Sequence, residues 1–145
     1  MAEIRVERSF TAPPPAVFDW LANAHNYTST PLCFWEKRAK DGKDAPYGEG
    51  AVRLVLGAGA WFKEEITAYE EPRYFEYVIV RSVPKFVHRG GRVLVEADGE
   101  GSKVTWTTAY EVPWWSGGKP VEKLTEPLLR SSFRSILQEC AKATG

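Results

Sequence analysis

The sequence predicts an α+β fold in which a curved antiparallel sheet of about six to seven strands wraps around a long C-terminal helix. Three observations predict it. A strand pattern near the N-terminus runs through prolines into a short helical pattern, alternating segments follow from residue 33 to residue 112, and the apolar period then changes from two to about 3.6. A sheet and a helix each bury an apolar face by packing together, so this order predicts a sheet curled around the last helix.

The first strand is predicted from residues 4–10, where apolar and polar residues alternate and leave one polar face. Pro13 to Pro15 end this strand, and the fixed φ of proline suits the first turn of a helix. Apolar side chains then recur at helical spacing, at Val17, Trp20, Leu21 and Ala24. We therefore expect a helix of about two turns that ends near Asn23 to Asn26.

Further strands are expected up to residue 112, separated by turns rich in glycine, proline and acidic residues. They are predicted at residues 34–38, 51–56, 61–69, 73–81, 86–97 and 103–112, with a loop at 41–50. A compact four-residue turn, Gly57 to Ala60, joins two of them. This turn places Arg53 opposite Glu64. Val55 then lies opposite Phe62.

A long terminal helix is predicted from about residue 119, because the apolar residues there recur at helical spacing. The stripe consists of Val121, Leu124, Leu128, Leu129, Phe133, Ile136, Leu137 and Cys140. Pro127 lies inside this segment and lacks the backbone donor that a helix interior uses. We expect a kink or a restart there, with Thr125 as the helix cap.

Composition limits the classes of function. The 145 residues fit one domain, residues 1–145, and 19 basic residues balance 19 acidic ones, so no net charge attracts nucleic acid. No apolar run is long enough to cross a membrane, and we expect a cytoplasmic protein with Cys33 and Cys140 reduced and buried. Phosphate-loop, dinucleotide and zinc-protease motifs are absent from the sequence, so we expect neither a metal nor a cofactor.

The aromatic content is high, with 6 Trp, 6 Tyr and 7 Phe, which fits either an aromatic-lined cavity or a bulky core. Two expected strands carry aromatic and polar side chains of one parity that would face the terminal helix. These residues are Phe75 and Tyr77 on one strand, and Trp106, Thr108 and Tyr110 on the other. A buried tyrosine hydroxyl needs a partner, so Tyr77 and Tyr110 are candidate ligand contacts. Simple packing against the helix is the alternative.

Arg53 and Glu64 share one face of their hairpin with Phe62 and other apolar residues. If this face points inward, the two charges lie in an apolar cavity and must meet each other, water or a ligand. Arg53, Phe62 and Glu64 are then candidate ligand-binding residues. A salt bridge on the outer face is the alternative, since the opposite parity is also apolar.

His88 stands just before Arg89-Gly90-Gly91, where a glycine pair inside a strand favours a bulge. Near a cavity mouth, His88 could donate a hydrogen bond to a ligand or act as a general acid or base. A structural role is the alternative. Trp114 and Trp115 precede a Gly-Gly pair, and in a surface loop they would form a lid, a membrane-touching edge or a partner contact. Packing onto the start of the terminal helix is the alternative for this pair.

Several short segments carry a resemblance to known proteins. They are Arg8-Ser9-Phe10-Thr11-Ala12-Pro13 through Val17-Phe18, Gly48-Glu49-Gly50 leading to Arg53, Glu64-Glu65-Ile66 with Pro72, Arg89-Gly90, and Gly101 to Trp106. In this order, over nearly the whole chain, they resemble the START-like (SRPBCC) superfamily, and within it small bacterial proteins of the polyketide cyclase/dehydrase type. The resemblance implies a helix-grip fold and a glutamate facing the cavity near position 64. It implies functions that range from cyclisation chemistry to simple binding.

Three hypotheses of function follow. The preferred one is non-enzymatic binding of a hydrophobic small molecule, a lipid or an aromatic, polyketide-like compound, between the sheet and the terminal helix. The second is a polyketide cyclase or dehydratase that uses the same cavity, with Glu64 or His88 moving protons. The third is a regulatory module that binds a protein partner through the Trp114 and Trp115 edge.

Overall fold

The computed structural model of the protein describes all residues from Met1 to Gly145. Seven antiparallel strands form one sheet in the order β1-β7-β6-β5-β4-β3-β2. The strands are β1 (Ala2–Phe10), β2 (Cys33–Lys40), β3 (Val52–Gly57), β4 (Ala60–Glu70), β5 (Tyr74–Val83), β6 (Val87–Asp98) and β7 (Gly101–Glu111). The helices are α1 (Pro14–Ala22), α2 (Gly118–Thr144) and the short 3₁₀ helices η1 (Ala24–Ser29) and η2 (Trp114–Ser116).

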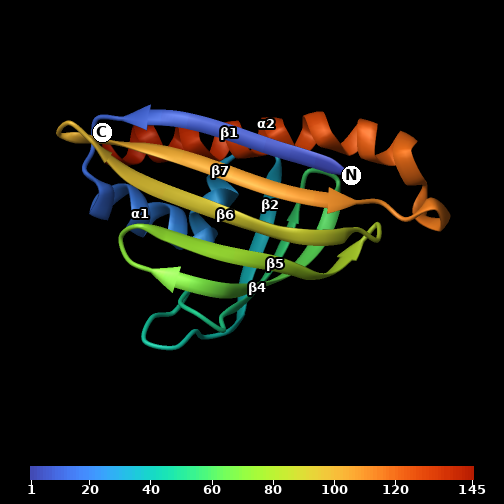
Figure 1. Cartoon of the computed structure of the whole chain (residues 1–145). Coiled ribbons are helices and arrows are strands. Elements are labelled where there is room, and N and C mark those ends of the chain that lie inside the picture. The colour runs from blue at the N-terminus through green and yellow to red at the C-terminus, as the bar shows by residue number, and fades with distance from the viewer.

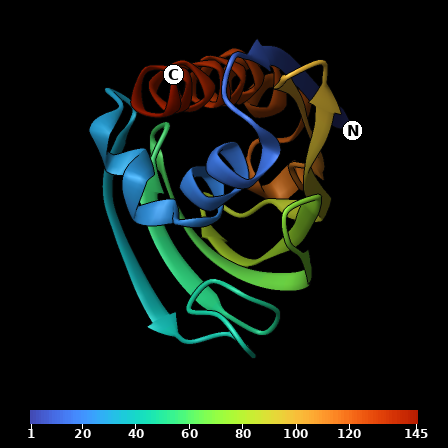
Figure 2. The same ribbon diagram turned by 90° about the vertical axis from the view of Figure 1, so that its left-hand side faces the viewer.

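The sheet curls, and α2 lies across its open side next to β1 (Figure 1). Seen from one end, the curl runs from β1 round to β2, and α1 with η1 closes that end (Figure 2). The predicted curved sheet, long C-terminal helix and short helix after the first strand are therefore confirmed. Closing the sheet in this way places its inner face, α1 and one side of α2 around a single interior.

The interior is filled by the apolar faces that the sequence patterns predict. On β1, Ile4 and Val6 are buried while their polar neighbours are exposed. Val17 and Phe18 of α1 are completely buried, and Pro14 starts this helix where a backbone donor is not needed. Burial of apolar side chains, at about 25 cal/mol per Å², is the main force that holds α1 inside the curl.

The β3–β4 hairpin has the predicted register and turn. Arg53 pairs with Glu64, and the ladder continues to a last pair between Gly57 and Ala60. The turn therefore has two residues, Ala58 and Gly59, with φ values of 52° and 78°. Positive φ at both positions gives the tight turn that matches the twist of the strands, so the compact turn predicted from Gly57 to Ala60 is confirmed, with Ala58 and Gly59 as its two central residues.

A kink or a restart is predicted at Pro127; helix α2 is continuous through this residue, so the restart is wrong. Thr125 is not a cap, because its hydroxyl donates within the helix to the carbonyl of Val121 at 2.9 Å. Proline at position 127 leaves the carbonyl of Lys123 without its usual donor. Both Lys123 and Pro127 are exposed, so water can take the place of that donor.

Candidate functional site

An internal cavity of about 60 Å³ lies between the inner face of the sheet and α2. Nineteen residues line it, and 13 of them are hydrophobic. The predicted site residues among them are Arg53, Phe62, Glu64, Tyr77, His88, Trp106, Thr108 and Tyr110. Helix α2 contributes Leu129, Ser132, Phe133 and Ile136, and η1 contributes Tyr27. The structure thus gathers residues from six strands and two helices around one apolar space.

Phe75 is the predicted ligand-binding residue that does not line this cavity. It is buried in the core, where its ring meets the edge of Phe18 at a centroid distance of 5.9 Å. The guanidinium carbon of Arg53 lies 5.9 Å from the centre of the same ring. Phe75 has the predicted parity, but α1 packs over this end of β5 and separates the ring from the open space.

Arg53 and Glu64 form an ion pair inside the protein. The Nε of Arg53 donates to Oε1 of Glu64 at 2.7 Å, and the two residues are only 1% and 8% exposed. They lie on the inner face, so the alternative of an outer-face salt bridge is wrong. Burial disfavours the charged guanidinium, but the Glu64 carboxylate together with the oxygens of Tyr27 and Tyr77 outweighs burial, and the pKa of Arg53 lies above its ordinary value.

The rest of the Arg53 guanidinium is surrounded by aromatic rings. Its central carbon lies 5.2 Å from the ring centre of Tyr77 and 5.6 Å from that of Tyr27. Its Nη1 atom has no hydrogen-bond partner and is the only buried side-chain nitrogen or oxygen of the chain in this condition. An unpartnered buried donor on a charged group costs more than about 1–3 kcal/mol. Nη1 is therefore a donor whose hydrogen bond remains to be made.

The tyrosines of the cavity are held in the neutral form. Trp106 donates from its indole nitrogen to the hydroxyl of Tyr77 at 2.9 Å, and burial raises the pKa of Tyr77 to about 12. Tyr27 donates to the carbonyl of Leu21, and burial raises the pKa of Tyr27 well above its usual range. These two hydroxyls therefore stay protonated at neutral pH and form part of the cavity wall.

His88 lies at the predicted bulge, where the β6–β7 register shifts between His88 and Gly90. Its Nδ1 accepts a hydrogen bond from the backbone nitrogen of Ile79 at 3.0 Å, and its Nε2 lies 2.5 Å from the Thr108 hydroxyl oxygen. An acceptor at Nδ1 places the proton on Nε2. Burial lowers the pKa of His88 to about 4. The imidazole is neutral and has no free lone pair for a reacting proton.

The position of His88 has a structural explanation. The β5–β6 ladder pairs Tyr74 to Tyr77 with Gly91 to Leu94 and then stops, so the backbone donor of Ile79 has no strand partner. Nδ1 of His88 accepts the hydrogen bond from the Ile79 backbone nitrogen, in the place of a β6 carbonyl oxygen. This geometry supports the structural alternative for His88.

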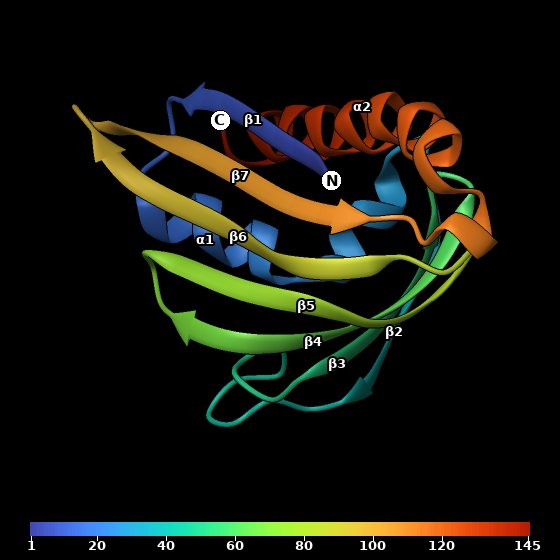
Figure 3. The same cartoon turned by 45° about the vertical axis from the view of Figure 1, so that its right-hand side comes forward.

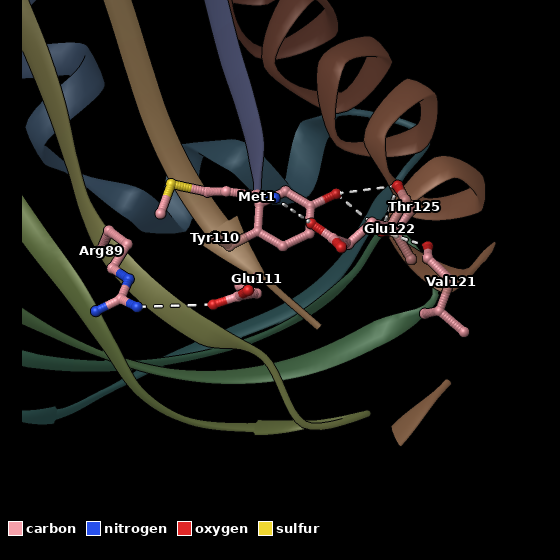
Figure 4. Close-up of polar contacts among 7 residues, drawn as sticks. All are labelled: Met1, Arg89, Tyr110, Glu111, Val121, Glu122 and Thr125. Atoms are coloured by element: carbon pink, nitrogen blue, oxygen red, sulfur yellow. Dashed lines mark hydrogen bonds and ion pairs between the residues drawn. The ribbon is translucent and has the colours of Figure 1, made fainter. Parts of the chain in front are cut away.

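Tyr110 ties the end of β7 to the first half of α2. Its hydroxyl lies 2.8 Å from that of Thr125 and 3.5 Å from the Glu122 carbonyl, and Figure 4 shows these contacts together. The buried Glu122 carboxylate lies 3.4 Å from the amino group of Met1. The Tyr110 hydroxyl is therefore already partnered, and Tyr110 lines one end of the cavity chiefly with its ring.

Trp114 and Trp115 form η2 and are 87% and 64% exposed. These exposures disagree with the alternative in which the pair packs onto the start of α2. Pro113 precedes η2, and Gly117 follows it with a φ of 112°, which a residue with a side chain rarely adopts. The two indole rings are thus carried on a short, fixed helical turn outside the cavity.

Both cysteines are unpaired and buried, and Cys33 lines the cavity. Burial raises the pKa of both thiols, to about 12 for Cys140. No three histidine, cysteine or carboxylate side chains come together as metal ligands. No helix is both long enough and apolar enough to span a bilayer.

Several lining residues were not predicted as site residues from the sequence. Tyr27 lies in a polar segment, Asn23 to Thr30, where no period of two or 3.6 marks it as inward-facing. Its ring is buried because η1 turns it toward Trp106, with a centroid distance of 5.9 Å. Phe133 belongs to the predicted apolar stripe of α2, and its ring stacks on Trp106 at 4.1 Å. The apolar stripe predicts that Phe133 faces inward, but it does not predict that Phe133 lines the cavity.

Comparison with solved structures finds the same fold in several proteins of low sequence identity. A START superfamily protein from Mycobacterium smegmatis has a TM-score of 0.78 and 11% identity, covering 99% of each chain. The protein TTHA0849 from Thermus thermophilus has a TM-score of 0.73 and 17% identity, covering 97% of this chain and 95% of its own. The di-domain ARO/CYC protein StfQ of the steffimycin biosynthetic pathway has a TM-score of 0.69 and 13% identity, covering 97% of this chain and 44% of its own.

A comparison with curated proteins gives no match. The family model described as polyketide cyclase / dehydrase and lipid transport matches residues 1–144. This match covers nearly the whole chain and agrees with the helix-grip arrangement and with the apolar cavity between sheet and helix. The protein therefore belongs to the polyketide cyclase/dehydrase and lipid transport family.

Proposed function

We propose that the protein binds an apolar small molecule between the sheet and α2, and that an oxygen acceptor on this molecule receives a hydrogen bond from Nη1 of Arg53. The unpartnered Nη1 is the observation that carries this proposal. A carboxylate or carbonyl oxygen would satisfy the donor, and the apolar walls would bind the hydrocarbon part of the ligand. The acceptor, rather than the cavity wall alone, then fixes the orientation of the ligand.

The size of the cavity indicates how the ligand enters. About 60 Å³ holds the polar end of a ligand, whereas pockets that enclose whole drug-sized molecules measure about 300–1,000 Å³. The ring of Phe133 stacks on Trp106 and is only partly buried, so it can leave while a ring of the ligand takes its place. Binding is therefore expected to displace side chains of α2, and the sheet side stays in position.

Matched probes with and without an acceptor test the proposal. We expect wild-type protein to bind 2-naphthoic acid about 10- to 100-fold more tightly than 2-methylnaphthalene, because a hydrogen bond to a charged group is worth about 1.5–3 kcal/mol. The double variant Arg53→Met/Glu64→Gln removes the donor without leaving Glu64 charged and unpaired. It should no longer bind the acid more tightly than 2-methylnaphthalene. Tighter binding of the acid that persists in this folded variant would contradict the proposal.

A polyketide cyclase or dehydratase is the second candidate, because one carboxylate lines the cavity. Glu64 is that carboxylate, and the hydrogen bonds of His88 leave Glu64 as the better candidate for moving a proton. Its Oε1 accepts from Arg53, which leaves Oε2 as the oxygen that can take a proton from a substrate. Glu64→Gln should abolish turnover of an aromatic polyketide substrate while leaving its binding within a few-fold. Unchanged turnover in this variant would exclude the role.

A further inference from the structure

One end of the molecule carries exposed apolar side chains that the binding cavity does not use. Trp114, Trp115, Leu124 and Leu128 are between 40% and 87% exposed. Val87 lines the same surface hollow as Trp114, and the β5–β6 turn lies beside η2 in Figures 1 and 3. We call this surface the tryptophan rim, made of Trp114, Trp115, Leu124, Leu128, Val83 and Val87.

The charges around the tryptophan rim are unequal, although the whole chain has no net charge. Every nearby acidic side chain has a cationic partner. Glu111 lies 3.6 Å from Arg89, Glu126 lies 2.8 Å from Arg130, and Glu122 lies 3.4 Å from the Met1 amino group. The first and third of these pairs are drawn in Figure 4.

The lysines beside the rim have no such partners. Lys85, Lys119 and Lys123 are exposed and form no ion pair. Lys85 belongs to the β5–β6 turn, while Lys119 and Lys123 lie in the first two turns of α2. The rim is therefore bordered by three positive charges that no acidic side chain neutralises.

We propose that the tryptophan rim docks on an anionic lipid bilayer. Indole rings favour the boundary between hydrocarbon and headgroups, because they are apolar rings with one polar edge. Unpaired lysines beside them are attracted to anionic headgroups within about 10 Å. The rim supplies both groups on one surface, and a bilayer accepts them without a pocket of complementary shape.

The rim lies directly outside the cavity. Phe86, Tyr110 and Leu129 line the cavity, and each is the chain neighbour of a residue at or beside the rim. Docking would thus hold this end of the cavity at the membrane, where apolar molecules are concentrated. This last consequence rests on the proposed binding function, whereas docking itself does not.

Flotation with lipid vesicles tests the docking. Wild-type protein should float with vesicles of phosphatidylcholine and phosphatidylserine, remain behind with pure phosphatidylcholine, and be released by salt. Lys85→Gln/Lys119→Gln/Lys123→Gln should weaken binding about 100-fold, since each lysine contributes about fivefold. Trp114→Ser/Trp115→Ser should weaken it about tenfold or more.

Matched controls keep the test specific. Lys37→Gln/Lys40→Gln/Lys43→Gln makes the same charge change in β2 and in the loop after it, and this loop lies away from η2 in Figure 3. Trp35→Ser removes a 43% exposed tryptophan from β2. Both controls should float like wild type. Binding of 2-naphthoic acid should be unchanged in the rim variants, which separates a failure of docking from a failure of ligand binding.

Three outcomes would overturn the proposal. The first is a wild-type protein that does not float with anionic vesicles, and the second is an equal loss of binding in the rim variants and the controls. The third is a protein that does not bind vesicles but dimerises through the same tryptophans. Light scattering would then show a dimer for wild type and a monomer for Trp114→Ser/Trp115→Ser. That result would assign the rim to a second copy of the chain.

Discussion

Replacing Arg53 alone with methionine should destabilise the protein by about 4 kcal/mol, because removal of Arg53 leaves the Glu64 carboxylate buried without a cation, a change that costs about 3–5 kcal/mol. Arg53 is 1% exposed and Glu64 is 8% exposed, and they share a hydrogen bond of 2.7 Å. The contacts of the guanidinium with the rings of Tyr27 and Tyr77 are lost as well. Together these losses give the expected destabilisation of about 4 kcal/mol.

The double variant Arg53→Met/Glu64→Leu distinguishes the cost of an unpaired buried carboxylate from the cost of lost side-chain packing. It buries no charge, so its stability should lie within about 1–2 kcal/mol of wild type. Urea unfolding at neutral pH measures all three proteins, and the slope with urea shows whether the folded states remain comparable. Arg89→Met is the matched control, because Arg89 is 54% exposed and lies 3.6 Å from Glu111. The free energy of unfolding of Arg89→Met should differ little from that of wild type.

If Arg53→Met costs no more than Arg89→Met, the buried ion pair is not desolvated as the structure describes it. If the double variant is as unstable as the single one, the loss comes from packing of the long side chain and not from the unpaired carboxylate.

Three further predictions concern the walls of the cavity. Burial lowers the pKa of His88 from 6.5 to about 4, so between these pH values the unfolded chain binds more protons than the folded protein. Urea unfolding should therefore show that the free energy of unfolding falls by about 3 kcal/mol from pH 7 to pH 4. His88→Gln should reduce this dependence of the free energy of unfolding on pH. Gly91→Ala should cost about 1–3 kcal/mol in urea, because the new Cβ would lie 2.2 Å from the ring of Tyr77, and Tyr77→Leu in the same chain should relieve it. Phe133→Ala should tighten binding of 2-methylnaphthalene while lowering the unfolding midpoint, because it removes the ring that stacks on Trp106; weaker binding would contradict the proposed entry route.

The fold could be predicted because several local signals agree. Alternation marks the strands, the prolines after β1 mark the start of α1, and the change of period marks α2. The register of Arg53 and Glu64 followed from the compact turn between Gly57 and Ala60. A period of two then placed both charges on the same face.

The chemistry of the site could be predicted only in part. Parity shows that Phe75 faces inward, but not that α1 covers it and keeps it from the cavity. The neighbours of His88 come from residues 9 and 20 positions away, so sequence alone does not show that both of its nitrogens are occupied. The unpartnered Nη1 of Arg53 depends on the packing of Tyr27 and Tyr77, and no spacing in the sequence encodes it.

A crystal structure with 2-naphthoic acid would test the central claim most directly. We expect the naphthalene ring to lie against Trp106 in the place of Phe133, with a carboxylate oxygen within hydrogen-bond distance of Nη1 of Arg53. An acid bound with its carboxylate away from Arg53, or a cavity that stays closed at saturating acid while Nη1 is satisfied by water alone, would contradict it.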